Sequence, residues 1–173
     1  VLFADTLVGK YNNSSPMSLV GVTATPVVSL ARGLVFVSNT ENLFAAFSFK
    51  DNKFEKKFVM PFGIYATPVL YGDILFVATN SNKMVAMNAI DGTIFWEADL
   101  KNGDDFYVLS TMVVNNNLLL NTSVGDVITI SLSNGKILNR QNLVSQFISP
   151  MIISGNNIIV IDGAGRVITY EYK

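Results

Sequence analysis

The chain has 173 residues, of which half are hydrophobic and 14% are charged, and its formal net charge is −1. This length suffices for one domain with a sizeable core, and the charge gives no electrostatic reason to expect nucleic acid or an acidic membrane as a partner. The sequence contains neither Cys nor His, which excludes catalytic pairs and triads built on them, and zinc sites with thiolate or imidazole ligands.

The predicted elements begin with a segment that differs from the rest. Residues 1–8 are typical of a single strand that ends at Gly9, and we expect residues 1–23 to be the end of a preceding structural unit. A first full repeat then occupies residues 24–65. It opens on Ala-Thr-Pro-Val-Val, and Pro is tolerated at the start of a strand because no ladder donor is needed there.

The second repeat, residues 66–110, is the clearest copy. It opens on Ala-Thr-Pro-Val-Leu and continues with an apolar strand at 74–78 and a third strand rich in small residues. An Asp-Gly pair at 91–92 predicts a tight hairpin, because these residues tolerate positive φ. The fourth strand, 93–100, carries the only tryptophan, Trp96, which we expect to pack between adjacent repeats.

Two further repeats follow, at residues 111–148 and 149–173, and the four anchor positions define a period. Thr25, Thr67, Thr111 and Ser149 lie 42, 44 and 38 residues apart, which suits a unit of four strands and three turns. The sequence therefore predicts an all-β fold, a β-propeller with four-stranded antiparallel blades, of which about four are present. Helical solenoids of similar period need 3.6-residue patterns that are absent here, and a β-sandwich would not require so regular a repeat.

The residues from Thr67 to Trp96 resemble the quinoprotein-type (PQQ-like) propeller repeat. Within that superfamily the chain is similar to the C-terminal half of the BamB family of outer-membrane assembly lipoproteins. The resemblance implies an eight-bladed ring on the periplasmic face of the bacterial outer membrane. It also implies a non-catalytic scaffold that binds a β-barrel insertase, with no cofactor or metal, and a lipid anchor outside this segment.

The resemblance also implies where a protein partner would bind. Family members dock through loops at one end of the ring, and the loop before the Thr-Pro-Val-Val strand usually carries acidic residues, where this chain has Gly21 and Thr23. The loops 62–65 and 106–107 place aromatic residues at an equivalent position. The candidate partner-binding residues are Leu19, Gly21, Thr23, Phe62, Tyr65, Asp104, Asp105 and Phe106.

Simpler interpretations stand beside these sites. The pair Asp104-Asp105 could bind calcium or a cationic partner surface, or lie in a solvated loop between blades. The run Asp162-Gly-Ala-Gly lacks the alternating oxygen ligands of a calcium loop and is typical of a hairpin turn. The aromatic residues of the loops could equally pack in the core.

Two questions stay open at this stage. About four blades do not close a ring of the expected size, so we expect either a fragment of a longer chain or a dimer of half-rings. The alternatives in function are a quinone-dependent dehydrogenase domain and a propeller with another protein partner. Against the enzyme, the sequence has no Cys and shows no calcium-binding set of Glu, Asn and Asp.

Overall fold

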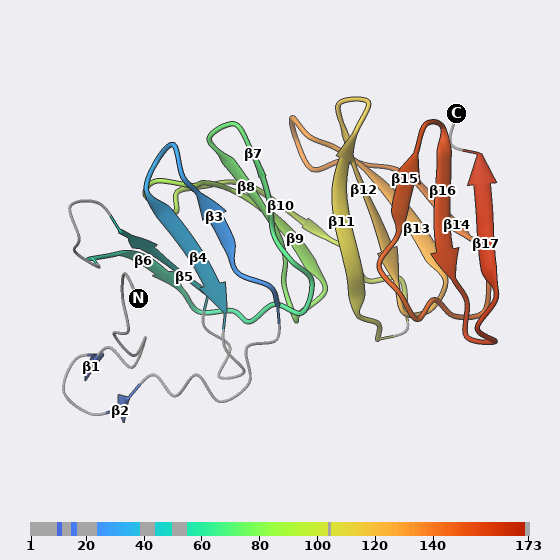
Figure 1. Cartoon of the computed structure of the whole chain (residues 1–173), viewed down its shortest axis with the longest axis horizontal. Coiled ribbons are helices and arrows are strands. Elements are labelled where there is room, and N and C mark those ends of the chain that lie inside the picture. Colours follow the sequence, from blue (N-terminus) through green and yellow to red (C-terminus); the bar gives the residue numbers. More distant parts are fainter. Residues whose placement is uncertain are drawn as a thin grey trace.

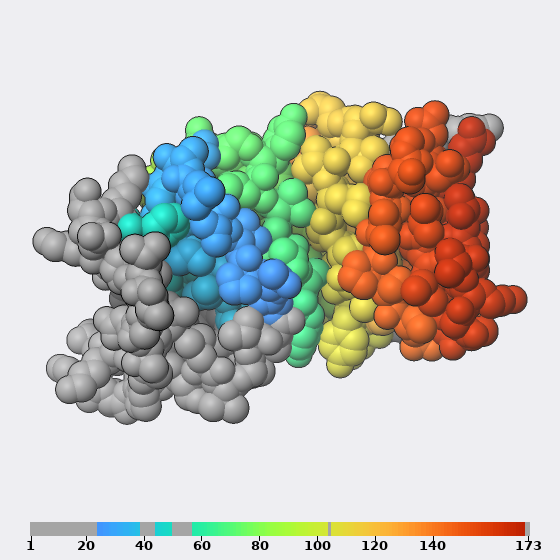
Figure 2. Space-filling view, viewed as in Figure 1, coloured from blue at the N-terminus to red at the C-terminus, as the bar shows by residue number. Residues whose placement is uncertain are grey.

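A computed structural model describes residues 10–11, 15–16, 24–38, 44–49, 55–103 and 105–171. These residues form β-sheets that follow one another in chain order along the long axis of the molecule (Figure 1). In the space-filling view the sheets appear as successive bands from blue to red (Figure 2). The described part of the chain contains no helix that could cross a membrane.

Each sheet is built from strands that are consecutive in the sequence. The strands are β1 (Lys10–Tyr11), β2 (Ser15–Pro16), β3 (Val27–Ser29), β4 (Leu34–Ser38), β5 (Phe44–Ser48), β6 (Glu55–Met60), β7 (Val69–Tyr71), β8 (Ile74–Ala78), β9 (Lys83–Asn88), β10 (Ile94–Asp99), β11 (Val108–Val114), β12 (Asn117–Thr122), β13 (Asp126–Ser131), β14 (Ile137–Asn142), β15 (Ile152–Ser154), β16 (Asn157–Ile161) and β17 (Val167–Glu171).

Three of the sheets have four antiparallel strands in simple meander order: β3–β6, β7–β10 and β11–β14. The sheet β15–β17 has three described strands, and β1 pairs with β2 as a separate two-stranded ribbon. The all-β architecture with four-stranded antiparallel blades is therefore confirmed. The predicted strand at 1–8 lies outside the described residues, and the repeat limits remain predictions.

The turns form where the sequence supplies residues that accept positive φ. Gly92 and Gly135, in the Asp-Gly and Asn-Gly pairs, have φ of 77° and 72°. Before each of these glycines, a side-chain oxygen accepts a backbone hydrogen bond two residues ahead: Asp91 Oδ1 from Thr93 N, and Asn134 Oδ1 from Lys136 N. The turn chemistry therefore sets the hairpin that leads into each fourth strand.

The core lies between neighbouring sheets, because both faces of the middle strands are covered. β8 and β9 are buried along most of their length, and Ala86 and Met87 are fully buried. The small alanines of the third strands, Ala45, Ala46 and Ala86, have no exposed surface, as expected where sheets approach closely. One apolar cluster joins β3–β6 to β7–β10, a second joins β7–β10 to β11–β14, and a third joins β11–β14 to β15–β17.

An aromatic residue of the fourth strand crosses to the next sheet at two of these junctions. Phe58 on β6 and Trp96 on β10 occupy equivalent positions, each opposite an alanine and just after a shift in register. A Cβ at Gly92 would lie 2.9 Å from the Phe58 ring, and one at Gly135 would lie 2.5 Å from the Trp96 indole. The indole also donates a 3.0 Å hydrogen bond to the Leu132 carbonyl, so the predicted packing of Trp96 between repeats is confirmed.

Candidate partner-binding rim

In the second, third and last sheets, the segment that leads into the first strand has one side chain fixed in the core. This residue is Ile64, Phe106 or Phe147, and all three are buried. Backbone pairing holds the segment against the end of the second strand, as in the bridges from Ile64 to Thr79 and from Phe147 to Asp162. Because side chains alternate along an extended backbone, the residue after each buried one faces outward.

The outward residues are Tyr65, Tyr107 and Ile148, and they form a repeated row that we call the aromatic rim. Their exposed fractions are 47%, 58% and 53%, so they present apolar surface to solvent. Two hydrogen bonds hold the backbone of Tyr107: its N–H donates to Ser123 Oγ at 2.9 Å, and its carbonyl accepts from Ser123 N at 2.8 Å. The row therefore sits on paired backbone and not on a loose loop.

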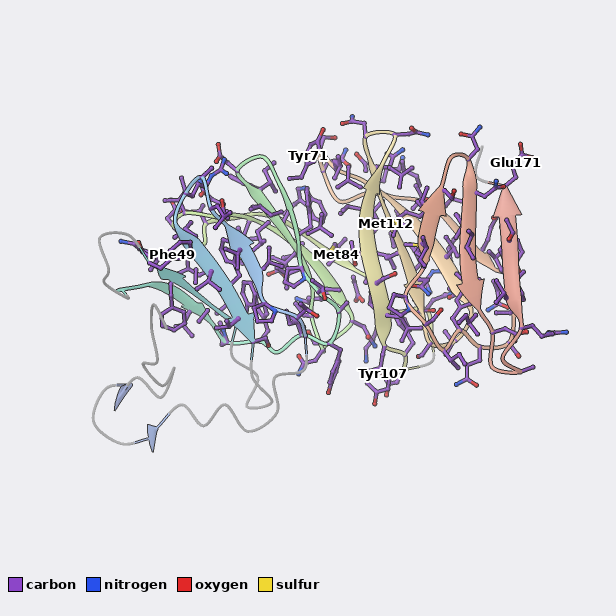
Figure 3. All side chains as sticks on the ribbon, in the orientation of Figure 1. Phe49, Tyr71, Met84, Tyr107, Met112 and Glu171 are labelled. Carbon is purple, nitrogen blue, oxygen red and sulfur yellow. The ribbon has the colours of Figure 1, made fainter. Side chains whose placement is uncertain are left out.

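Tyr65 and Tyr107 come from neighbouring blades and touch. Their ring centroids lie 5.1 Å apart with an interplanar angle of 79°, an edge-to-face geometry that aromatic pairs favour. They line a shallow hollow of ≈ 310 Å³ together with Val108 and Leu109. Tyr107 lies at one rim of the molecule and Tyr71 at the opposite rim (Figure 3).

Two of the predicted contact residues lie inward of this rim. Phe106 is buried, and the guanidinium of Arg140 lies 5.7 Å from the centre of its ring. Phe62 is half-buried, belongs to the cluster between the first two blades and stacks on Phe44 with ring centroids 6.0 Å apart. We therefore replace Phe106 by its neighbour Tyr107 in the candidate surface and assign Phe62 to the packing beneath it.

The acidic residues of the candidate surface are only partly described. Asp105 is highly exposed and forms an ion pair with Lys101, with 3.2 Å between Lys101 Nζ and Asp105 Oδ1. This contact lies in solvent and within one loop. Asp104 lies outside the described residues, as do Leu19, Gly21 and Thr23. Among the residues that the structure describes, no group of three or more acidic side chains could hold a metal ion.

The sequence nevertheless gives Thr23 a position in the repeat. Residues 21–27 read Gly-Val-Thr-Ala-Thr-Pro-Val, and residues 63–69 read Gly-Ile-Tyr-Ala-Thr-Pro-Val. In this register Thr23 corresponds to Tyr65. The predicted loop residue Thr23 and the observed rim residue Tyr65 thus hold the same place in consecutive blades. Sequence analysis selected the aromatic residues of these loops, so it did not select the aliphatic Ile148.

The sequence model of one protein family, described as outer membrane protein assembly factor BamB, matches residues 5–98, more than half of the chain. The chain belongs to the BamB family. A curated relative is an uncharacterized protein of Rickettsia conorii, 25% identical over 123 residues, and the match covers 65% of this chain and 29% of the relative. The chain therefore spans less than a third of the length of that relative.

Solved structures confirm the propeller fold of this BamB-family chain. BamB from Moraxella catarrhalis matches with a TM-score of 0.72 at 18% identity, over 88% of this chain and 45% of that one. The computationally designed Ika4 protein matches with a TM-score of 0.70 at 9% identity, over 88% and 92% of the two chains. Quinohemoprotein alcohol dehydrogenase from Comamonas testosteroni matches with a TM-score of 0.65 at 11% identity, over 87% and 35%.

Proposed function

We propose that this BamB-family chain is a non-catalytic scaffold that binds a protein partner through its aromatic rim. We propose that this partner is the β-barrel insertase of the outer membrane and that the chain acts at the periplasmic face of that membrane; the family description as an assembly factor supports both. Attachment to the membrane would then come from a lipid anchor outside this segment. The observation that carries the proposal is the contact between Tyr65 and Tyr107 across two blades, in a chain whose family is described as an assembly factor.

The chemistry of the rim suits protein binding. Tyrosine supplies a large contact area at a low cost in side-chain entropy, and its hydroxyl tolerates both water and a polar partner. Repetition in successive blades makes the rim an extended surface, on which a partner segment could contact Tyr65, Tyr107 and Ile148 in turn. The predicted residues Leu19, Gly21 and Thr23 would extend the same surface by one blade.

The test is binding of the immobilised insertase of the source organism, measured for the unchanged chain and for the double variant Tyr65→Ala, Tyr107→Ala. We expect at least a tenfold loss of affinity, because truncating aromatic anchors at the centre of an interface commonly costs about 2 kcal/mol or more. Tyr71→Ala is the matched control: Tyr71 is 52% exposed, like the rim tyrosines, but it lies at the opposite rim (Figure 3).

The control should bind as tightly as the unchanged chain. Equal losses in the rim variant and the Tyr71 control would contradict the assignment of the surface. No binding of the insertase by the unchanged chain would contradict the assignment of the partner and favour a propeller with another protein partner.

A quinone-dependent dehydrogenase domain is the second candidate, because an alcohol dehydrogenase has the same fold. The described residues fit that role poorly, since none of their acidic groups forms a set for the calcium ion that accompanies the quinone. Titrating the chain with pyrroloquinoline quinone and calcium by calorimetry separates the two proposals. Binding accompanied by dye-linked dehydrogenase activity would replace the scaffold proposal.

A further inference from the structure

The connection from β10 to β11 carries two of the candidate contact residues, Tyr107 of the aromatic rim and the acidic Asp105. This connection is described except at residue 104. Its start and its end are buried, because Leu100 has no exposed surface and Phe106 is 5% exposed, whereas the Asp105 side chain is 89% exposed. The position of the contact residues therefore depends on how the buried ends of the connection are held.

The guanidinium of Arg140, on β14 of the third blade, contacts both of these ends. Its Nη2 donates a hydrogen bond to the Leu100 carbonyl at the start of the connection. Its Cζ lies 5.7 Å from the centre of the Phe106 ring near the end. A guanidinium is attracted to an aromatic face, and the attraction is stronger where water is excluded. One side chain of the third blade therefore bridges the two ends of the connection.

The guanidinium is itself held in place. Its Nη1 forms a 3.0 Å ion pair with Asp126 Oδ2, and the two side chains are only 17% and 12% exposed. Asn142 Nδ2 donates to the other carboxylate oxygen of Asp126 at 2.9 Å and to the Val124 carbonyl at 2.8 Å. Because a guanidinium is a rigid planar fork, fixing one of its nitrogens on a carboxylate also fixes the direction in which the other donates.

The other two complete blades have no cation at this position. The residue that follows the inward-facing side chain of the fourth strand is Val59 in β6, Glu97 in β10 and Arg140 in β14. Valine has no side-chain donor, and Glu97 pairs with Lys83 at 2.9 Å in a contact where both side chains are nearly half exposed. Among the complete blades, the bridge is therefore specific to the connection that carries Tyr107.

The backbone of the connection shows what the bridge contributes. The N–H of Leu100 donates to the Asn82 carbonyl at 2.8 Å, and the N–H of Lys101 donates to Asp99 Oδ1 at 2.9 Å. The Leu100 carbonyl accepts from Arg140. A buried carbonyl without a donor is costly, so loss of the guanidinium would favour states in which this carbonyl turns toward water. Such states would move the start of the connection away from the second blade.

We propose that Arg140 is a positioning residue for the partner-binding surface. It holds both ends of the connection, so that Tyr107 and Asp105 are already in place when a partner binds. A partner then does not have to order these side chains, which favours affinity. This inference rests on the proposed function and adds to it a residue of β14 that acts through Leu100 and Phe106.

Two variants that both lack the ion pair isolate the bridge. Asp126→Asn keeps Arg140, whose guanidinium can still donate to the Leu100 carbonyl and lie over Phe106. The double variant Asp126→Asn, Arg140→Gln replaces the ion pair by two amides, and the shorter glutamine has no cation to place over the ring. Circular dichroism of both variants verifies that the sheets are intact.

Amide hydrogen exchange, followed by mass spectrometry of peptides, measures the connection without any partner. Peptides that cover residues 100–107 should exchange about tenfold faster in the double variant than in Asp126→Asn, because the N–H groups of Leu100, Lys101 and Tyr107 leave their acceptors more often. Peptides that cover β4, in the first blade, should exchange within about twofold of one another in the two variants.

Binding to the immobilised insertase measures the consequence for the surface. We expect the double variant to bind about fivefold more weakly than Asp126→Asn, because the partner must then order Tyr107 and Asp105. Asp126→Asn should bind within about twofold of the unchanged chain. Glu97→Gln, at the equivalent position of β10, is the matched control and should change neither exchange at residues 100–107 nor binding.

Three results would overturn the proposal. These are equal exchange at residues 100–107 in the two variants, equal affinity of the two variants for the insertase despite different exchange, and the same losses in Glu97→Gln. Failure of the unchanged chain to bind the insertase would contradict the proposed function, whereas the exchange measurement decides separately whether Arg140 holds the connection. The failures of the two proposals are therefore distinguishable.

Discussion

The junction between the second and third blades and the junction between the third blade and the last sheet use the same strands in different ways. At the first, Trp96 of the fourth strand reaches across and packs on Gly135 of the next turn. At the second, the equivalent residue of the fourth strand is Asn139, which lines an open groove of ≈ 430 Å³ between the third blade and the last sheet. Blade packing thus depends on what the fourth strand presents to its neighbour, and not only on the buried middle strands.

A buried ionic contact strengthens the first junction further. Arg140 on β14 forms a 3.0 Å ion pair with Asp126, and both side chains are mostly buried. The same guanidinium donates to the Leu100 carbonyl, which follows β10, and lies over the Phe106 ring. Asn142 adds a 2.9 Å hydrogen bond to Asp126. One cation therefore ties the third blade to the end of the second.

The largest expected effect comes from breaking that contact. Asp126→Ala should lower the free energy of unfolding by about 3 kcal/mol, because it leaves the Arg140 charge buried without its carboxylate. Chemical denaturation followed by circular dichroism measures the change. Lys101→Ala, which removes an exposed ion pair with Asp105, is the control and should change stability by less than about 0.5 kcal/mol. Comparable losses in both variants would show that the buried pair has no special role.

Substitutions at two adjacent residues of β12 allow the two junctions to be compared directly. Leu118 and Leu119 are both fully buried, but Leu118 belongs to the cluster of the closed junction and Leu119 lines the groove. We expect Leu118→Ala to cost about 3 kcal/mol and Leu119→Ala about 2 kcal/mol in free energy of unfolding, because the side chains beside the groove have room to relax around a shortened residue 119. Denaturation of the two variants measures the difference, and a larger cost at Leu119 would contradict the comparison.

A smaller effect is expected for Trp96→Phe. The substitution removes the hydrogen bond from the indole to Leu132 O and part of the contact with Gly135, and should cost about 1–2 kcal/mol. The replacement Phe95→Leu, at the exposed neighbouring position, is the control. Equal losses in free energy of unfolding for the two substitutions would contradict the conclusion that the inward-facing residue of the fourth strand joins the blades.

The smallest effect is expected in the last sheet and depends on pH. The side-chain hydrogen bond from Arg166, followed by the N–H groups of Arg166 and Ala164, lowers the pKa of Asp162 below its ordinary value near 3.8. A lowered pKa means that the charged form stabilises the fold above pH 3.8 and that this contribution is lost as pH falls through the folded-state pKa.

Thermal unfolding of the unchanged chain and of Asp162→Asn checks this. The unchanged chain should have the higher melting temperature. This difference should become smaller as the pH is lowered below 3.8, because Asp162 is then protonated whereas Asn does not titrate. The effect is small because Arg166 is largely exposed to solvent. A constant difference between the two proteins at all pH values would show that Asp162 acts only as a neutral acceptor.

Much of each blade could be predicted from the sequence because the signals are local. The Asp-Gly and Asn-Gly pairs specify positive φ, and the apolar run at 74–78 is the strand β8 (Ile74–Ala78). The packing of Trp96 between repeats also followed from sequence, because the repeat pattern places this residue in a fourth strand, beside the next blade. These features depend on backbone stereochemistry and on short apolar runs, both of which are set by neighbouring residues.

The candidate site was predicted less completely. The sequence indicated the loops at 62–65 and 106–107, but it could not say which aromatic residue of each loop is buried. That choice depends on the bridge from Ile64 to Thr79 and on the hydrogen bonds between Tyr107 and Ser123, which pair residues distant in sequence. Only this pairing turns Tyr65 and Tyr107 outward and Phe106 inward.

The sequence by itself thus determined the repeat, its strands and its turns, because the apolar runs and turn residues that specify them lie within each repeat. The tertiary structure decided how the repeats meet: which side chains form the aromatic rim, which cation joins two blades, and where a groove lies between sheets. Those properties arise between blades, where residues about 40 positions apart come together, as Arg140 does with Leu100. No window of sequence within one repeat contains both partners.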